Sequence, residues 1–220
     1  MEILHHDRVD EILVSSNDLY PPESMQQLIN GLEIRDLYFS EGNSDVDAMI
    51  YLNAIKPTRS FFLDGSPLFV WNHTKMSQFF IQSLDHIIIE EASLLNLDDL
   101  LLMNISEIQI VTTRMTGKDF NRFLKHWIAG SNPRLKYLSV GGQSKTDDGE
   151  EFAMELLHGI NYRKMADGEK MTCVICMGTS EERTETISGG SYIRRKDGTK
   201  AIVYSEDTWF QFILQEFMSI

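Results

Sequence analysis

The expected architecture is α/β: a leucine-rich-repeat-like stack of strands and helices that ends in a C-terminal β-hairpin. Short segments with apolar residues at alternate positions recur through the first two-thirds of the chain, and amphipathic segments separate them. Near the C-terminus an Asp-Gly pair lies between two strand-like runs, which is a strong local signal for a hairpin. These two patterns together predict the stack and its final turn.

The strand-like segments carry apolar residues with a period of two, which places those side chains on one face of a strand. Four of them share an L-x-x-L-x-L spacing, at residues 34–39, 84–89, 105–110 and 135–140, and residues 60–63 form a shorter apolar run. Because one such unit cannot bury its apolar face alone, neighbouring units are expected to share a core and to present a curved sheet. A three-layer α/β fold with the same order of elements is the alternative.

The best-defined helix is expected to begin at Thr116, which has the spacing of a capping box with Asp119. Its apolar residues follow the i, i+3, i+4, i+7, i+8 spacing of a helix that faces a core. They are Phe120, Phe123, Leu124, Trp127 and Ile128. Gly130 fits the position after the helix end, and residues 131–133 turn the chain into the next strand. Other helices are expected from Ser44 to a stop before Pro57, and at residues 74–82, 93–103 and 148–159.

The last third of the chain is expected to be richer in strands. Residues 171–177 have strand-like composition, and the polar residues 178–190 are expected to form a loop. Residues 191–195 and 200–204 flank Asp197 and Gly198, a pair that favours a type I′ turn, in which both central residues need positive φ. Residues 208–217 are rich in aromatic side chains, which favours a final strand over a short helix.

The charge balance argues against two classes of partner. Acidic residues outnumber basic residues by 33 to 20, and the formal net charge is −13. A field of that sign repels polyanions and anionic membranes, so nucleic acid and membranes are not expected as partners. The short basic run at residues 194–196 is expected at a solvated hairpin tip. The absence of a secretory signal or a bilayer-length apolar run favours a cytoplasmic or nuclear protein with reduced thiols.

Two residue pairs have spacings that occur in chemical sites, and for each a structural role is favoured. Cys173 and Cys176 are the two cysteines of the chain and lie in an expected strand, where residues three apart point to opposite faces. Glu155 and His158 have the helical spacing found in di-iron bundles, but the sequence has no second Glu-x-x-His pair. We therefore expect no catalytic, cofactor-binding or metal site.

Two stretches have more specific patterns. Residues 118–135 (KDFNRFLKHWIAGSNPRL) are similar to a motif of the form LNxFLKHWxxGSNPRLxxL, and residues 192–201 (YIRRKDGTKA) are similar to a closing hairpin of the form YDIxRKDGTKAT. Both patterns resemble the type 2 F-box-associated region of nematode F-box proteins. The resemblance covers about residues 95–205. Taken by themselves, these residues are core positions and turn positions, so they specify fold rather than chemistry.

The resemblance implies a protein–protein interaction module similar to the substrate-recognition region of F-box ubiquitin-ligase receptors. In that family an N-terminal F-box docks on the Skp adaptor of a cullin ligase. Residues 1–30 contain Pro21 and Pro22 but otherwise depart from the F-box pattern, so we expect a poorly defined N-terminal segment without an F-box. A single domain is then expected at residues 31–220. Loss of the F-box in a paralogue and a shortened gene model are both open explanations.

The expected partner is therefore an unidentified protein, with an indirect link to a Skp–cullin ubiquitin ligase, and the chain is not expected to be an enzyme. Either the strand surface or the hairpin end is expected to bind it. Two alternatives stay open. One is a degenerate paralogue that keeps its fold but has no partner. The other is a small hydrolase-type enzyme that uses His86, Glu90 or Glu155 as acid–base groups, which would require a pocket that gathers them.

Overall fold

The computed structural model describes residues 7–15, 21–40, 51, 54–64, 73–141, 149–176, 182–206 and 209–219. Its α-helices are α1 (Pro22–Ile29), α3 (His73–Phe80), α4 (Leu97–Leu102), α5 (Gly117–Ala129) and α6 (Gly149–Leu156). The first six strands are β1 (Arg8–Val14), β2 (Glu33–Phe39), β3 (Pro57–Leu63), β4 (His86–Ala92), β5 (Glu107–Thr113) and β6 (Tyr137–Val140). The remaining strands are β7 (Tyr162–Lys164), β8 (Lys170–Cys176), β9 (Glu182–Ser188), β10 (Ser191–Arg194), β11 (Lys200–Glu206), β12 (Trp209–Leu214) and β13 (Met218–Ser219).

Ten of these strands form one mixed sheet, in the order β1-β2-β3-β4-β5-β6-β12-β11-β10-β7. The strands β1 to β6 lie in sequence order and every neighbouring pair among them is parallel. From β6 onward the pairing changes: β12, β11, β10 and β7 join as antiparallel neighbours. The sheet thus has a parallel N-terminal part and an antiparallel C-terminal part that meet between β6 and β12.

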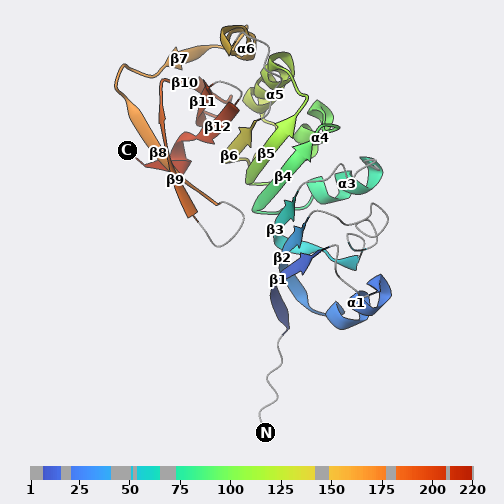
Figure 1. Cartoon of the computed structure of the whole chain (residues 1–220). Helices are drawn as coiled ribbons and strands as arrows, with labels where there is room; N and C mark the ends of the chain where they lie inside the picture. Colours follow the sequence, from blue (N-terminus) through green and yellow to red (C-terminus); the bar gives the residue numbers. More distant parts are fainter. Residues whose placement is uncertain are drawn as a thin grey trace.

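The described helices of the parallel part lie on the same face of the sheet (Figure 1). Each connection there moves one strand along the sheet in the same direction, and such crossovers are almost always right-handed. Because these connections run in the same direction along the sheet and are right-handed, the helices within them lie on one side of the sheet. Figure 1 shows α1, α3, α4 and α5 along this side, and the β8–β9 ribbon on the opposite side.

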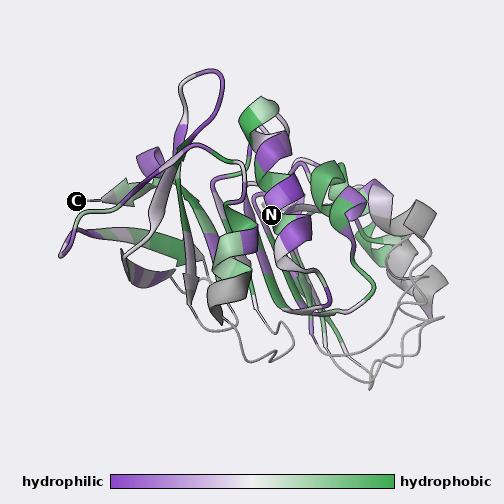
Figure 2. Cartoon of the chain, turned by 90° about the horizontal axis from the view of Figure 1, so that it is seen from above, coloured by the Kyte–Doolittle hydropathy of each residue, from purple (hydrophilic) through white to green (hydrophobic). Residues whose placement is uncertain are grey.

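The core under the helices is built from side chains in register across the parallel strands. Ile87 of β4 lies beside Ile108 of β5, which lies beside Leu138 of β6, and all three are fully buried. In the hydropathy view of Figure 2, apolar colour follows the strands under the helices. The alternating aliphatic pattern of the sequence therefore forms a continuous apolar layer, as expected from its period of two.

Helix α5 covers the junction between the parallel and antiparallel parts. Thr116 and Asp119 form the predicted capping box, and Gly130 ends the helix with a φ of 121°. The ring of Phe120 stacks on Phe210 of β12 with centroids 4.7 Å apart, and the ring of Trp127 meets Phe212 edge-on at 4.8 Å. Aromatic pairs in these geometries stabilise a core beyond the area that they bury. The longest motif of the sequence thus fastens β12 to the sheet.

The predicted hairpin is confirmed, and its tip contacts the end of α5. Strands β10 and β11 pair from Ser191 with Val203 to Arg194 with Lys200. The backbone N–H of Lys196 donates to the carbonyl of Ile128 at 3.1 Å, and the guanidinium of Arg195 lies 5.3 Å from the centre of the Trp127 ring. The two stretches that resemble one family therefore touch each other in the fold.

The predicted type I′ turn is wrong. Gly198 has a φ of 97°, whereas Asp197 has a negative φ. The N–H of Gly198 donates to the carbonyl of Arg195, and the N–H of Arg195 donates to the carbonyl of Thr199. The hairpin loop is longer than a two-residue type I′ turn. It needs a positive φ at one residue, and Gly198 adopts that conformation without strain.

A second sheet of three strands, in the order β13-β8-β9, packs on the face opposite the helices. It contributes Met171, Cys173, Ile175 and Ile187 to a separate apolar cluster. The main sheet contributes Tyr137, Ile202 and Ile213 to the same cluster. The small sheet therefore covers the antiparallel half of the main sheet on this face.

The predicted leucine-rich-repeat-like α/β stack is wrong. The described residues are mostly β, and the last third of the chain extends the same sheet with four antiparallel strands instead of adding a separate hairpin. The predicted loop at residues 178–190 is also wrong over its second part, because residues 182–188 form β9. Alternating apolar residues specify which side chains of a strand face the core, but not which neighbouring strand it pairs with. The pattern therefore did not distinguish a repeat stack from the mixed sheet.

Other expectations have mixed outcomes. Residues 84–89, 105–110 and 135–140 contribute to neighbouring parallel strands, as predicted. The aromatic segment 208–217 is confirmed as a strand, β12, followed by a 3-10 turn at Gln215–Phe217. Most of the helix predicted from Ser44 lies outside the described residues. No helix in the described ranges has the length and apolar content needed to cross a membrane.

Asn132 connects α4 to the start of β6. It has a φ of 48°, a left-handed conformation that asparagine tolerates better than most residues. Its buried side-chain amide donates to the carbonyls of Leu100 and Met103 at 3.1 and 3.0 Å. These carbonyls lie at the end of α4, where the helix leaves acceptors without the usual N–H four residues on. The carbonyl of Leu100 also accepts from the N–H of Met103 at 3.3 Å, and Asn132 adds a donor to each of the two carbonyls.

We predict that Asn132→Ala lowers the free energy of unfolding by about 3 kcal/mol, because it removes two buried hydrogen bonds and places a Cβ-bearing residue in a strained conformation. Asn132→Gly should cost about 1 kcal/mol less, since glycine relieves the backbone strain and leaves the lost hydrogen bonds as the main effect. Urea unfolding of both variants measures the difference. Equal stability of wild type and Asn132→Ala would contradict this account.

Candidate functional site

On the face opposite the helices, no described helix or second sheet lies over β1 to β5 (Figure 1). Since the small sheet covers β6, β12 and β11, it forms one wall beside this strip. The strip carries one apolar row and one polar row, because neighbouring side chains of parallel strands stay in register across the sheet. This strip is called the open face below.

The apolar row runs across four strands at matching positions. Leu13 lies beside Tyr38, Tyr38 beside Phe62, and Phe62 beside Ile88. The rings of Tyr38 and Phe62 stack with centroids 4.3 Å apart and planes 8° from parallel. Leu13 is 59% exposed at one end, Tyr38 and Ile88 are half-buried, and Phe62 between them is buried. Aromatic and aliphatic groups held rigidly in this way are typical anchors of protein interfaces.

The polar row is made of two pairs of ionisable side chains. Arg59 bonds to both carboxylate oxygens of Asp36, with its Nε 2.8 Å from Oδ1. Nδ1 of His86 lies 3.4 Å from Oε2 of Glu107, and both side chains are largely buried. The pair of Arg59 with Asp36 neutralises two charges next to the apolar row, and the polar row limits where a partner can place its own charges.

A polar bridge joins the small sheet to the main sheet beside this row. The carboxylate of Glu185 on β9 accepts from Nε2 of Gln211 at 2.9 Å and from the hydroxyl of Tyr137 at 3.3 Å. Burial and the charge of Glu185 raise the pKa of Tyr137 above its ordinary value. The hydroxyl therefore stays protonated and remains a donor, which holds the two sheets in one arrangement.

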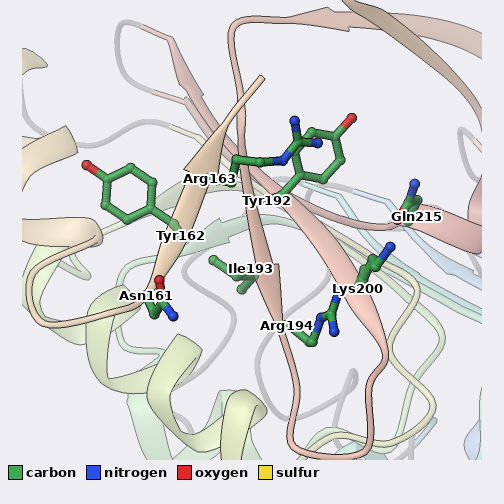
Figure 3. A pocket seen from close by; sticks show the side chains of 8 residues that line it. All are labelled: Asn161, Tyr162, Arg163, Tyr192, Ile193, Arg194, Lys200 and Gln215. Carbon is green, nitrogen blue, oxygen red and sulfur yellow. The ribbon is translucent and has the colours of Figure 1, made fainter. Parts of the chain in front are cut away.

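A second candidate surface lies at the hairpin end, where β7, β10 and β11 meet (Figure 3). A hollow of about 420 Å³ is lined by Asn161, Tyr162, Arg163, Tyr192, Ile193, Arg194, Lys200 and Gln215. Three of these side chains are cations and two are neutral amides. This hollow is called the hairpin pocket below.

The acid–base residues of the enzyme hypothesis are not brought together. His86 begins β4 and faces Glu107, whereas Glu90 is exposed near the other end of the same strand. Glu155 lies on α6, where its carboxylate pairs with Lys118 at 3.2 Å. A hollow between α5 and α6 contains Glu155 and His158 but neither of the other two residues. Across the described residues, no group of three His, Cys, Asp or Glu side chains could hold a metal ion.

Cys173 lies in β8 and is buried in the apolar cluster between the two sheets. Burial raises the pKa of its thiol to about 11, and the carboxylates of Glu185 and Glu107 act in the same direction. A reactive cysteine needs the opposite shift, because the thiolate is the nucleophile. Strand β8 also includes Cys176, so the backbone of this pair differs from the turn and helix start of a redox motif.

Sequence reasoning missed the residues that form both surfaces. Tyr38 and Phe62 belong to separate strand-like segments, and their stacking depends on the register of β2 against β3. Arg163 and Tyr192 are far apart in the sequence and meet because β7 pairs with β10. The signal available in the sequence was the cluster of basic residues near the hairpin, which we assigned to a solvated tip.

We predict that the free energy of unfolding falls as the pH rises from about 9 to about 11. The folded chain keeps Cys173 protonated up to a pKa of about 11, whereas the ordinary thiol pKa is 9.0. The unfolded chain releases this proton first, so its stabilisation is present below pH 9 and is lost as the pH passes the folded pKa. Tyr137 contributes in the same direction. Urea unfolding across this pH range tests the slope.

The matched control is Cys173→Ala. This variant should be less stable near neutral pH, because it loses buried sulfur contacts, but its stability should fall less steeply above pH 9. The pH dependence of the unfolding free energy that remains in this variant then comes from Tyr137 and other titrating groups. Identical slopes in both proteins would contradict the role assigned to the buried thiol.

Comparison with known proteins supports one part of the resemblance. Residues 75–140 match the family model described as F-box associated. The E3 ubiquitin-protein ligase hecw-1 of Caenorhabditis elegans is 27% identical over 63 residues, which cover 29% of this chain and 5% of that protein. The chain therefore spans a small part of the length of this relative. No solved structure matches the chain. The F-box-associated resemblance is confirmed for residues 75–140, and the hairpin at 192–201 lies outside the matched range.

Proposed function

We propose that this chain, which carries an F-box-associated region at residues 75–140, is a protein–protein interaction module that holds a partner on its open face. The partner is a protein with an apolar segment that lies across the row formed by Leu13, Tyr38, Phe62 and Ile88. No bond is made or broken in this role. In this role the chain presents a rigid surface of defined shape to its partner.

The observation that carries this proposal is the place of the matched region in the fold. Residues 75–140 include β4, β5 and β6, which form the centre of the main sheet. Their inward side chains build the core, and the side chains on the other face contribute Ile88 and the pair of His86 with Glu107 to the open face. The matched region thus supports a surface as well as a core.

The chemistry of the open face suits a protein better than a small molecule. The apolar row crosses four strands, β1 to β4, and the open face therefore forms a broad surface. Small-molecule sites are instead concave pockets that enclose most of the ligand. Because β-strands hold Tyr38 and Phe62 in place, a partner loses little free energy in ordering them.

The finer assignment is substrate recognition within a ubiquitin-ligase pathway, in the cytoplasm or nucleus. The F-box-associated match and the similarity to a ubiquitin-protein ligase support it. In this assignment the contact with a Skp–cullin ligase is indirect, because another subunit or segment supplies the adaptor-binding part. A stable complex between the purified chain and a Skp-type adaptor would overturn the indirect link.

We predict that the double variant Leu13→Glu/Ile88→Glu loses its partners, because two buried carboxylates would oppose an apolar contact. Quantitative affinity capture from the source cells, after crosslinking, should recover those partners at least about tenfold less than wild type. Circular dichroism and urea unfolding establish that the variant is folded.

The matched control is Leu94→Glu/Leu102→Glu, which adds the same charge at two exposed leucines in α4 and in the turn that precedes it. It should recover the same partners as wild type. Equal recovery with both double variants would refute binding at the open face. Among the partners that depend on the open face, ubiquitylation that rises with the amount of chain would support the ligase assignment.

A further inference from the structure

Positive charge is concentrated at the hairpin end, although the chain as a whole is strongly acidic. Residues 161–170 and 191–200 hold seven Lys and Arg and three Asp and Glu, a local net charge of +4 within a chain of net charge −13. The separation places a cationic surface on an anionic body. Such a surface attracts a short anionic ligand, while the rest of the molecule repels a long one.

Most of the nearby acidic groups are already engaged. Asp197 pairs with Arg195 at 2.7 Å and accepts from the backbone N–H of Thr199, and these bonds hold the pKa of Asp197 below its usual range. Glu169 accepts from the hydroxyl of Tyr192 at 2.6 Å and from the N–H of Ala166. Asp197 is therefore committed to Arg195, and Glu169 to Tyr192 and Ala166, although the charge of Arg163 also lowers the pKa of Glu169. Within the described ion pairs, no carboxylate is paired with Arg194 or Lys200.

Two of those cations oppose each other directly across the hairpin. Arg194 of β10 is the register partner of Lys200 of β11, and both are exposed (Figure 3). Like charges at directly opposed positions destabilise a strand pair. Among the ion pairs of the described residues, none includes Arg194 or Lys200. An anion bound between them would remove this repulsion, which is a source of binding free energy built into the fold.

The third cation is held in a fixed orientation. The guanidinium of Arg163 lies 4.5 Å from the centre of the Tyr192 ring, and Figure 3 shows the two side chains against each other. The hydrogen bond from Tyr192 to Glu169 fixes that ring. Stacking leaves the edge of a guanidinium free to donate, so Arg163 can bind an oxyanion at a low cost in side-chain entropy.

From this geometry we infer that the hairpin pocket binds a short peptide segment whose central side chain is a phosphate monoester. Arg163, Arg194 and Lys200 would contact the phosphate oxygens, and the amides of Asn161 and Gln215 would contact the flanking backbone. The volume of about 420 Å³ accommodates a phosphorylated side chain and its neighbours. Guanidinium groups favour phosphate because two donors match two oxygens. The inference deepens the proposed function, on which it rests, by naming a class of partner sequence.

A peptide fits better than a nucleic acid. A nucleic-acid strand extends its charge beyond the pocket, over a surface that carries the rest of the acidic residues. A peptide with one phosphate and neutral flanking residues has its charge only within the pocket, so the acidic surface around the pocket does not repel it. The pocket also lies at the opposite end of the main sheet from β1, where the open face begins, so the two surfaces can be tested separately.

The test uses the full chain and three fluorescent nonapeptide libraries with neutral flanking positions and a central phosphoserine, glutamate or serine. We predict that the phosphoserine library binds at least about tenfold more tightly than the serine library, with glutamate between them. Inorganic phosphate and added salt should both weaken the binding. Fluorescence anisotropy measures each affinity.

Arg194→Gln/Lys200→Gln should weaken phosphoserine binding at least about tenfold, and Lys164→Gln/Lys196→Gln, which removes two charges outside the pocket, should change it less than about twofold. Equal binding of the serine and phosphoserine libraries, equal losses in both double variants, or tighter binding of a short single-stranded RNA would each overturn the inference.

The two proposals can fail separately. If the phosphoserine library does not bind while partner capture still depends on Leu13 and Ile88, the pocket assignment is wrong and the interaction module stands. If capture is insensitive to Leu13 and Ile88 while phosphoserine binding holds, the open-face proposal falls instead.

Discussion

The handedness of the strand connections determines most of this structure. The strands β1 to β6 follow each other in sequence order along the sheet, and the described helices between them, α1, α3, α4 and α5, lie on one side. Because right-handed crossovers in one direction place their helices on one face, no described helix from these connections lies on the opposite face. The small sheet covers part of that face, and the open face is what remains. A surface that a partner can reach is thus a consequence of topology.

The junction between the parallel and antiparallel parts depends on aromatic packing. Phe120 and Trp127 of α5 contact Phe210 and Phe212 of β12, and the hairpin tip then contacts the end of the same helix. The stretch at residues 118–135 therefore does more than form a helix. It fastens the C-terminal strands to the sheet and positions the hairpin whose cations line the pocket. Residues with a structural role in the core thus set the geometry of a surface site.

The two candidate surfaces differ in their physical chemistry. The open face offers rigid apolar groups between satisfied ion pairs, such as Asp36 with Arg59, and gains free energy when a partner excludes water from it. The hairpin pocket offers cations that repel each other until an anion binds, as with Arg194 and Lys200. A partner that engages both would combine a broad apolar contact with a local charge requirement. Such a combination favours specificity, because a protein that satisfies one surface alone binds more weakly.

Local patterns were enough to identify several elements before the fold was known. The capping box at Thr116, the end of the helix at Gly130 and the hairpin around Gly198 all follow from residues within a few positions of each other. The alternating segments at residues 84–89, 105–110 and 135–140 were also correctly assigned to adjacent strands. The antiparallel extension of the sheet, strand β9, the stack of Tyr38 on Phe62 and the facing cations of the hairpin pocket were decided by tertiary structure. Each of these depends on which strand edges pair and in which register, and that choice is made by burial across the whole core, which no local stretch of sequence contains.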